Sequence, residues 1–376
     1  MRLFNVYSKF NISISKAKGV YLYDDKNKKY LDLYGGHGVI SIGHSHPTFT
    51  NKIKVQLDKI GFYSNSIQIP IQQKLANKLT KQSGYPNHNL FLCNSGAEAN
   101  ENAIKIASFH TNRKKVIAFK GSFHGRTAAN LNITDNSSIS APINLDNFPV
   151  DFIELNSESS LINCLKNKDV CAVIIEGIQG VGGLDYPSID YLKCLKKNTK
   201  KYGTLLILDE IQSGYGRTGK FFAHQYADIE ADIVTMAKGM GNGFPVGGVL
   251  IHSKIRAIKG ILGSTFGGNH LACSAGIAVL ETLENEKLLE NALQISAYLK
   301  TELSSLSEVQ NVKGKGLMLG LEFDYSIQEI RSKLVYDYHI FCGSSANPNV
   351  LRILPPLNIS KKQIQPLITS LKEILI

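Results

Sequence analysis

The sequence predicts an α/β protein with a mainly parallel β-sheet buried on both faces, followed by a smaller α+β domain. Three observations carry this prediction. Short apolar runs alternate with helical patterns through the middle of the chain, chemically active side chains follow several of these runs, and the pattern changes after Gly268. Continuous apolar runs separated by helices are typical of parallel sheets, which bind ligands at the carboxyl ends of their strands.

The chain begins with short strands and continues into the expected sheet. Residues 20–36 predict two strands around a polar turn at Asp24–Lys29. The runs that we expect to form the strands of the central sheet are residues 90–93, 116–119, 171–176, 204–210, 233–237 and 247–251. They lack the polar alternation of a half-exposed sheet, so helices should cover both faces.

The C-terminal third has a different pattern. Residues 271–300 predict a long helical stretch, and residues 317–323 and 350–354 predict strands. A last helix should begin at Ser360, because Ser360 and Gln363 have capping-box spacing. We place the domain limits at 1–45 for an N-terminal segment that packs with the small domain, 46–265 for the large domain and 266–376 for the small domain.

The basic charge of the chain does not indicate nucleic-acid binding. The net charge of the 376 residues is +11, but only seven of the 42 basic residues are arginine, and the lysines are scattered among asparagines. Nucleic-acid binders use the bidentate guanidinium for phosphates and guanines. We therefore expect a solvated basic surface and no nucleic-acid partner.

Other features place the protein in a reducing compartment. The six cysteines are spread out with no C-x-x-C pair, which predicts neither a disulfide framework nor a metal site. No run approaches the ~18 apolar residues of a membrane span. The first residues also lack the apolar block of a secretory signal. We expect a cytoplasmic protein without a membrane or metal partner.

Two turns at strand ends carry polar groups. After the run ending at Cys93, Ser95 and Glu98 form a capping box, so a helix should begin there and offer its N–H groups to an anion. Asp209 and Glu210 close another run. A carboxylate at a buried strand end needs a partner. A metal, a cationic ring nitrogen or an ordinary salt bridge could serve.

Two further segments add a lysine and an aromatic ring. Lys238 follows the run 233–237, where desolvation would lower its pKa and make it a Schiff-base amine; the alternative is a solvated lysine. Phe123, His124 and Arg126 lie within four residues and could supply a ring stacker and a carboxylate clamp, or simple packing. Together, a phosphate cup, an aromatic ring, a carboxylate and a lysine are what pyridoxal 5′-phosphate (PLP) requires.

Longer motifs surround these features. They are NSGAEANENAIKIA, FHGRT, LDEIQSGYGRTGKFFA, DIVTMAKGMGNGFPVGGV and STFGGNHLA. With them the chain resembles the class III (subgroup II, fold type I) PLP-dependent aminotransferases over nearly its whole length, and within them the acetylornithine and succinylornithine aminotransferases. The resemblance implies PLP as the cofactor, a homodimer with shared active sites, and transfer of the δ-amino group of an N2-acylornithine to 2-oxoglutarate in arginine biosynthesis.

The resemblance also implies residue roles. Lys238 would hold the cofactor and move protons, Asp209 would pair with the pyridine nitrogen, and Gln212 would pair with the ring hydroxyl. The other implied cofactor-binding residues are Ser95, Gly96 and Ala97 at the phosphate, Phe123 and Ile211 on the ring faces, His124, and Thr265 from the neighbouring subunit. The implied substrate-binding residues are Arg126 and Arg352 for carboxylates, together with Glu176, Tyr63 and Asn65.

One position departs from the family pattern. Enzymes of the family that use ω-amines generally read EPxQGEGG, and the second glutamate covers the carboxylate-binding arginine. This chain reads EGIQGVGG, with Val181 at that position. Our hypothesis is that an uncovered Arg352 favours donors with an extra carboxylate, such as an N-succinyl group, unless Glu176 or another residue covers it. Other class III enzymes acting on ornithine, 4-aminobutyrate or lysine-type donors remain alternatives, as does a non-catalytic basic binding protein on this fold.

Overall fold

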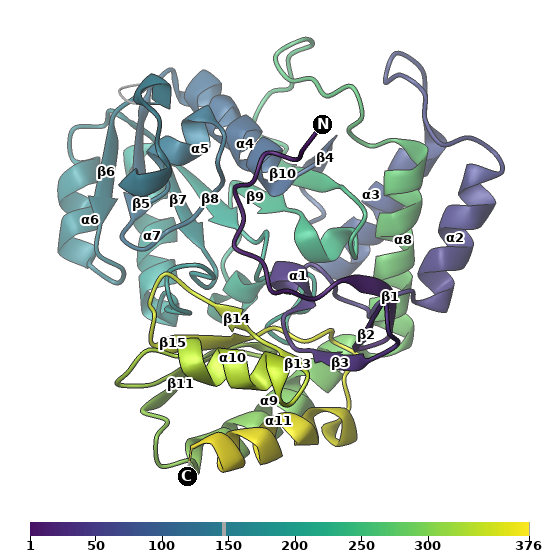
Figure 1. Cartoon of the computed structure of the whole chain (residues 1–376). Helices are drawn as coiled ribbons and strands as arrows, with labels where there is room; N and C mark the ends of the chain where they lie inside the picture. The colour runs from purple at the N-terminus through teal and green to yellow at the C-terminus, as the bar shows by residue number, and fades with distance from the viewer. Residues whose placement is uncertain (145–147, 376) are drawn as a thin grey trace.

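The computed structural model of the chain describes residues 1–144 and 148–375. Within this part, one seven-stranded sheet has the order β4-β10-β9-β8-β7-β5-β6 (Figure 1). Its strands are β4 (His88–Cys93), β5 (Lys115–Phe119), β6 (Val150–Ile153), β7 (Val170–Glu176), β8 (Leu205–Asp209), β9 (Ile233–Met236) and β10 (Gly247–His252). All six apolar runs are therefore strands. β6, whose sequence VDFI is short and partly polar, was not predicted.

The sheet is parallel except at one strand. β5, β6, β7, β8 and β9 pair in parallel, whereas β10 runs antiparallel to both β9 and β4. A parallel connection needs a crossover of about a dozen residues or more, usually a helix. Residues 237–246 link β9 to β10 with only the short turn η4 (Lys238–Met240), so the chain reverses direction there.

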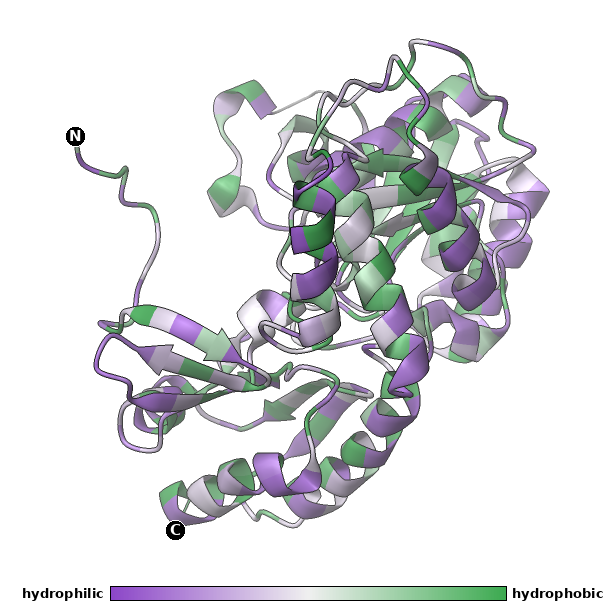
Figure 2. Ribbon diagram, turned by 90° about the vertical axis from the view of Figure 1, so that its right-hand side faces the viewer, coloured by the Kyte–Doolittle hydropathy of each residue, from purple (hydrophilic) through white to green (hydrophobic). Residues whose placement is uncertain are grey.

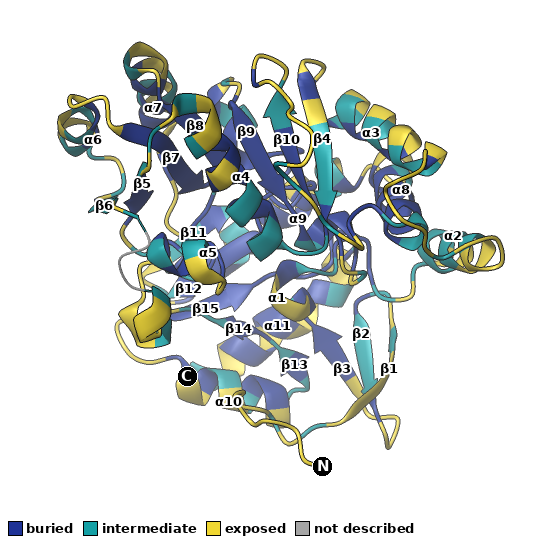
Figure 3. Cartoon of the chain, turned by 90° about the horizontal axis from the view of Figure 1, so that it is seen from above, coloured by how far each residue is buried: buried dark blue, intermediate teal, exposed yellow. Residues whose placement is uncertain are grey.

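Helices cover both faces of this sheet, as the apolar runs predict. Every residue of β7 and β8 is buried, and Figure 3 shows the central strands enclosed by more exposed helices. Hydrophobic residues lie mainly on the strands and on the inner helix faces (Figure 2). The helices of this part are α2 (Pro47–Leu57), α3 (Pro70–Ser83), α4 (Gly96–Thr111), α5 (Ala128–Asn132), α6 (Glu158–Leu165) and α7 (Ile189–Tyr202), with the short turns η1 (Ser137–Ile139), η2 (Pro142–Asn144) and η3 (Ala223–Ala227).

The long helical stretch predicted over 271–300 is confirmed, and it consists of two helices. α8 (His270–Asn285) and α9 (Leu288–Ser304) are separated at Lys287, which adopts a left-handed φ of 51°. The break lies in the polar stretch Asn285–Lys287 and lets each helix keep its own apolar face. α8 packs against α2 and α3.

The C-terminal part is a second layered unit. Its sheet has the order β11-β12-β15-β14, with β11 (Asn311–Lys315), β12 (Met318–Glu322), β14 (Gly343–Ser344) and β15 (Val350–Ile353). Helices α9, α10 (Gln328–Tyr336) and α11 (Lys361–Ile374) lie beside it (Figure 1). Ser360 and Gln363 form the capping box predicted at the start of α11.

The N-terminal segment joins this C-terminal part. Strands β1 (Ile14–Lys18), β2 (Tyr21–Asp24) and β3 (Lys29–Asp32) form an antiparallel meander, and β3 pairs in parallel with β13 (Ile340–Phe341). The next element, α1 (Gly35–Gly38), leads the chain towards the large sheet. Among the described residues, no helix is both long and apolar enough to cross a lipid bilayer.

Candidate active site

A cavity of about 350 Å³ lies where the parallel strands end. Its wall includes Ser95, Gly96 and Ala97 after β4, Phe123, His124 and Gly125 after β5, Glu176 of β7, Asp209, Ile211 and Gln212 at the end of β8, and Lys238 after β9. The carboxyl ends of the strands in open α/β sheets are the usual ligand site. The structure thus brings together the four features that the sequence predicted.

The start of α4 forms one end of this cavity. Ser95 is the N-cap, and its Oγ accepts the backbone N–H of Glu98 at 3.2 Å, while the Glu98 carboxylate accepts the backbone N–H of Asn94 at 3.2 Å. The first N–H groups of a helix have no helical partner and lie at its positive end. A Cβ at Gly96 would lie 2.9 Å from the Ile211 side chain, so a residue with a side chain there would force Ile211 to shift. The turn is built to hold an anion.

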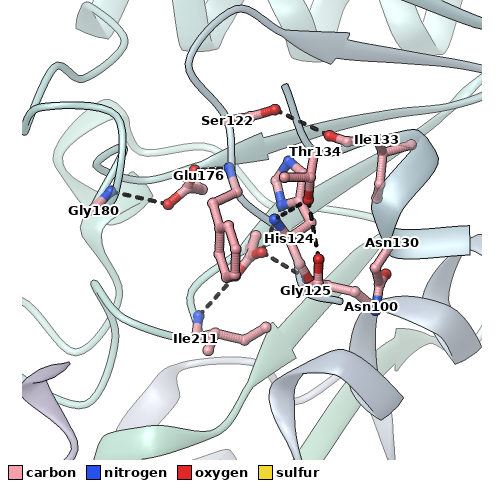
Figure 4. A network of polar contacts seen from close by, with 12 residues as sticks. Asn100, Ser122, His124, Gly125, Asn130, Ile133, Thr134, Glu176, Gly180 and Ile211 are labelled. Atoms are coloured by element: carbon pink, nitrogen blue, oxygen red, sulfur yellow. Dashed lines mark hydrogen bonds and ion pairs between the residues drawn. The ribbon is translucent and has the colours of Figure 1, made fainter. Parts of the chain in front are cut away.

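Asp209 is a buried carboxylate with a fixed orientation. Its Oδ2 accepts the Asn100 side-chain N–H at 2.8 Å and lies 2.7 Å from His124 Nδ1, and its Oδ1 accepts the Ile211 N–H at 3.0 Å. Figure 4 shows Asn100, His124 and Ile211 in this network. The side chain is only 4% exposed. A carboxylate held in this way can face a cationic nitrogen without reorienting.

Lys238 lies on the same cavity wall. Burial lowers the pKa of its amine, although the carboxylates of Asp209 and Glu176 act in the opposite direction. A lysine with a lowered pKa has more of the neutral, nucleophilic amine at neutral pH. Lys238 also has a φ of 43°, a left-handed conformation that is costly for a residue with a side chain. Strain of this kind is concentrated at functional sites.

Comparison with known proteins identifies the family. The model of the family described as "Aminotransferase class-III" matches residues 4–375. The chain belongs to the class-III aminotransferase family. It is 39% identical to the acetylornithine aminotransferase of Bacillus subtilis (strain 168), over 99% of this chain and 97% of that protein. It is 36% identical to the LysW-aminoadipate semialdehyde/glutamate semialdehyde transaminase of Sulfolobus acidocaldarius, over 99% and 97% of the two chains.

Solved structures agree with this assignment. The ornithine aminotransferase of Toxoplasma gondii ME49 superposes with a TM-score of 0.91 at 26% identity, covering 98% of this chain and 92% of that one. The predicted fold class and the resemblance to class-III aminotransferases are confirmed. The protein is a PLP-dependent aminotransferase.

The cavity of this class-III aminotransferase fits PLP. The start of α4 offers N–H groups and a glycine for close approach of a phosphate. Gln212 Oε1 is buried and has no hydrogen-bond partner among the described residues, so a donor group would satisfy it. When bound, the cofactor serves as an electron sink for the substrate. The fixed carboxylate of Asp209 and the amine of Lys238 complete the set of groups that it needs.

The predicted substrate residues Glu176 and Arg352 lie beside the cavity and are linked through the backbone. Glu176 accepts the N–H groups of Phe123 and Gly180 at 2.9 and 3.0 Å, and burial raises its pKa to about 7. Arg352 is 4% exposed and donates from Nη1 to the Gly180 carbonyl at 2.6 Å. No carboxylate of the described residues lies within ion-pair distance of this guanidinium, and its Nε has no partner there. The half-buried Val181 adds no charge.

The other predicted residues lie outside this cavity in the single chain. Arg126 and Tyr63 are exposed. Asn65 and Thr265 border a separate surface depression, where Asn65 donates to the carbonyls of Ser264 and Gly267 at 3.2 and 3.0 Å. Asn65 therefore braces the loop that carries Thr265. Their roles toward a cofactor or substrate remain predictions.

Two residues near the site were missed by the sequence analysis. Asn100 donates a hydrogen bond to Asp209. The sequence feature that could have indicated it is a polar amide within the buried face of α4, which also contains Ala103, Ile104 and Ala107. The backbone carbonyl of His37 accepts the Gln212 side-chain N–H at 3.0 Å. The sequence feature that could have indicated His37 is its position as the one residue with a side chain in a run of glycines, since such runs usually have an unusual backbone conformation.

Glu210 forms a separate, fully buried network behind the cavity. Its carboxylate accepts the Ser213 hydroxyl at 2.6 Å and lies 2.7 Å from His224 Nδ1, and His224 Nε2 lies 2.6 Å from the Tyr85 hydroxyl. The Tyr85 hydroxyl also accepts the Ala231 N–H at 3.2 Å. This network anchors the segment after Asp209, so Glu210 has a structural role in this class-III aminotransferase.

Replacing Tyr85 with phenylalanine tests that network. Because His224 Nε2 and the Ala231 N–H would lose a buried partner, we expect a loss of about 1–3 kcal/mol of folding stability. Thermal unfolding of the Tyr85→Phe variant should show a lower Tm than wild type. Tyr7→Phe is the control, since Tyr7 is 67% exposed and should leave the Tm unchanged. Equal Tm values for wild type and Tyr85→Phe would contradict this role.

Proposed function

We propose that this aminotransferase moves the δ-amino group of an N2-acylornithine, with an acetyl or succinyl group, to 2-oxoglutarate. The products are the N-acylglutamate semialdehyde and glutamate, and the reaction belongs to arginine biosynthesis. Support comes from full-length similarity to acetylornithine aminotransferases at 34–39% identity. The observation that carries the proposal is the buried guanidinium of Arg352, which has no carboxylate partner among the described residues and lies beside the cavity that holds Lys238, because this site can orient a carboxylate-bearing amine.

In this proposal the residues of the chain would hold the cofactor and move one proton. Lys238 Nζ would hold the cofactor at rest, and its amine would then take the proton from Cδ of the donor. Asp209 would pair with the pyridine nitrogen, and Gln212 with the ring hydroxyl. The start of α4 would hold the phosphate, and Phe123 and Ile211 would cover the ring. His124 acts through Asp209, which it orients from 2.7 Å.

The substrate would be oriented by its carboxylates. Arg126 is assigned to the carboxylate of the acylornithine, and Arg352 to the α-carboxylate of 2-oxoglutarate or glutamate. Because Arg352 is almost fully buried, solvent would weaken the ionic interaction between its guanidinium and a bound carboxylate only a little. Glu176 holds the Phe123 and Gly180 backbones, and so sets the position of the ring stacker and of the Arg352 contact.

A panel of amine donors assayed with 2-oxoglutarate tests the function. Glutamate formation should be fastest with N2-acetylornithine or N2-succinylornithine, and slower with ornithine and 4-aminobutyrate. An N2-acylated lysine belongs in the panel, because one relative carries the name of a LysW-aminoadipate semialdehyde transaminase. A single methylene discriminates by only about 1–3 kcal/mol. Fastest turnover of ornithine or 4-aminobutyrate would refute the proposal.

Val181 leads to a prediction about the acyl group. With no glutamate there to cover Arg352, the kcat/KM for N2-succinylornithine should exceed that for N2-acetylornithine by about tenfold or more, since a charge-assisted contact contributes about 1.5–3 kcal/mol. Steady-state kinetics with both donors measures this ratio. A Val181→Glu variant should reverse the preference, and Val181→Leu is the matched control that should retain it. A wild-type preference for the acetyl donor would exclude this explanation.

We also propose a cytoplasmic homodimer with shared active sites. Phe62, Tyr63, Ile67 and Phe266 are exposed apolar side chains, and the rings of Phe62 and Phe266 lie 5.2 Å apart next to Thr265. Such patches are typical of protein interfaces. The N-terminal segment stands away from the body of the chain (Figure 2) and exposes further apolar side chains, Leu3, Phe4, Val6 and Tyr7. All six cysteines are free, as is usual in a reducing compartment.

The dimer can be tested at the apolar patch. Phe266→Asp should place a charge in the interface and shift the mass measured by sedimentation from two chains towards one. Phe109→Asp is the control, because Phe109 is exposed to a similar degree but lies on α4. A monomeric wild-type protein, or a Phe266→Asp variant that stays dimeric, would contradict this interface.

A further inference from the structure

One side chain near the cavity has no role in the function proposed above. Gly35, Gly36, His37 and Gly38 all have left-handed backbone conformations, with φ values of 56°, 55°, 66° and 74°. Glycine adopts these values freely, but a residue with a Cβ does so at a cost in free energy. His37 is the only side chain in this run. Because such strain is concentrated at functional sites, the position of the imidazole merits a functional explanation.

Contacts on two sides fix His37. Its carbonyl accepts the Gln212 side-chain N–H at 3.0 Å, which ties the loop to the cavity wall. The Tyr34 hydroxyl contacts both imidazole nitrogens, Nδ1 and Nε2, and the two rings lie 4.7 Å apart. The same Tyr34 ring lies 5.9 Å from the guanidinium carbon of Arg352. The backbone of His37 is therefore tied to the cavity wall, and its imidazole is linked through the Tyr34 ring to the carboxylate-binding arginine.

The surroundings of His37 are strongly positive. Partial burial of the ring, together with the charges of Arg352, Lys238 and Arg126, lowers the pKa of His37 to about 4. The imidazole is neutral at pH 7 and has one N–H donor and one acceptor nitrogen. Neither Arg352 nor Arg126 forms an ion pair within the described part of the chain. The region suits a ligand with more than one carboxylate, and the side chain of His37 is exposed enough to reach it.

We propose that His37 is a specificity-determining residue, whose imidazole N–H donates a hydrogen bond to the carboxylate that Arg352 binds. The Tyr34 hydroxyl lies within contact distance of both ring nitrogens. When it donates to one of them, the N–H of the other is left for the carboxylate. The site then selects dicarboxylates, namely 2-oxoglutarate and a donor whose acyl group ends in a carboxylate. This inference rests on the proposed function and adds a second contact for the same substrate group.

Direct binding of an unreactive dicarboxylate tests the contact without turnover. Glutarate is titrated into the holoenzyme by calorimetry. His37→Gly relieves the left-handed strain, so it should fold with a Tm at or above that of wild type. Its affinity for glutarate should fall about tenfold or more. His37→Asn tolerates the same backbone conformation and keeps an N–H donor, so its affinity should stay within about threefold of wild type.

A matched control separates the lost imidazole from the relieved strain. Lys287 is also left-handed, with a φ of 51°, but it lies at the break between α8 and α9. Lys287→Gly should bind glutarate as wild type does. The kcat/KM ratio of N2-succinylornithine to N2-acetylornithine should fall in His37→Gly and be largely restored in His37→Asn.

The outcomes separate this inference from the proposed function. Unchanged glutarate affinity in His37→Gly, or no glutarate binding by wild type, would overturn the role of His37 even if acylornithines are turned over. If glutarate binding depends on His37 but the enzyme transfers no amine from acylornithines, the contact is supported and the proposed donor is refuted.

Discussion

Replacing Lys238 with alanine is expected to abolish steady aminotransfer, with kcat at least about 10⁴-fold below wild type. One amine is assigned two tasks, holding the cofactor and moving the substrate proton, and no other lysine is among the residues that line the cavity. Burial lowers the pKa of this amine, so it can act as a base. Glutamate formation from N2-acetylornithine or N2-succinylornithine with 2-oxoglutarate measures the loss.

Two further measurements make this result specific. Lys220→Ala is the matched control, because Lys220 is exposed on the neighbouring GRTGK segment and should retain full turnover. Borohydride reduction of the wild-type holoenzyme followed by peptide mapping should place the label on residue 238. Normal turnover in Lys238→Ala, or a label at another lysine, would refute the assignment.

Changing Asp209 to asparagine should lower kcat by about 10²–10⁴-fold while preserving the shape of the site. The carboxylate is held by Asn100, His124 and the Ile211 N–H, and its charge is what a cationic ring nitrogen requires. Removing one partner of a buried charge pair costs about 3–5 kcal/mol, which corresponds to the expected loss of rate. Steady-state kinetics at saturating substrate measures kcat.

Asp232 provides the control for that change. It is also a buried carboxylate, and it accepts the Leu206 N–H at 2.8 Å, but it lies at the amino end of β9, whereas Asp209 closes the carboxyl end of β8. Asp232→Asn should therefore reduce thermal stability with little effect on kcat. Equal kinetic losses in the two variants would show that Asp209 acts only through folding.

The sequence predicts the strands of this fold better than their directions. Four of the six apolar runs, residues 116–119, 171–176, 204–210 and 233–237, are buried at every position, and segments buried in this way must be apolar throughout, whereas β4 is only partly buried. An apolar run has the same composition in either direction, so only the short link 237–246 reveals that β10 is antiparallel. The break at Lys287 was missed because apolar residues continue on both sides of it.

The residues of the candidate site could likewise be predicted only in part from the sequence. Ser95, Asp209 and Lys238 were predictable because each follows an apolar run, and the carboxyl ends of parallel strands converge. Asn100 and His37 were not, because their importance comes from contacts with residues more than 100 positions away in the chain. Such contacts depend on tertiary packing, which local patterns do not encode.

The pairing of β3 with β13 has a consequence for how the protein is made. The Leu31 N–H donates to the carbonyl of His339, and the Leu354 N–H donates to the carbonyl of Leu33, so these N-terminal strands are completed by residues that are synthesised much later. The strands of the large sheet precede residue 253 and can pair earlier during translation, whereas the strands that lead into Gly35–Gly38 must wait for residues 339–354. Ordering of this segment is thereby a late event, and a chain truncated before residue 339 would leave β3 without its partner β13.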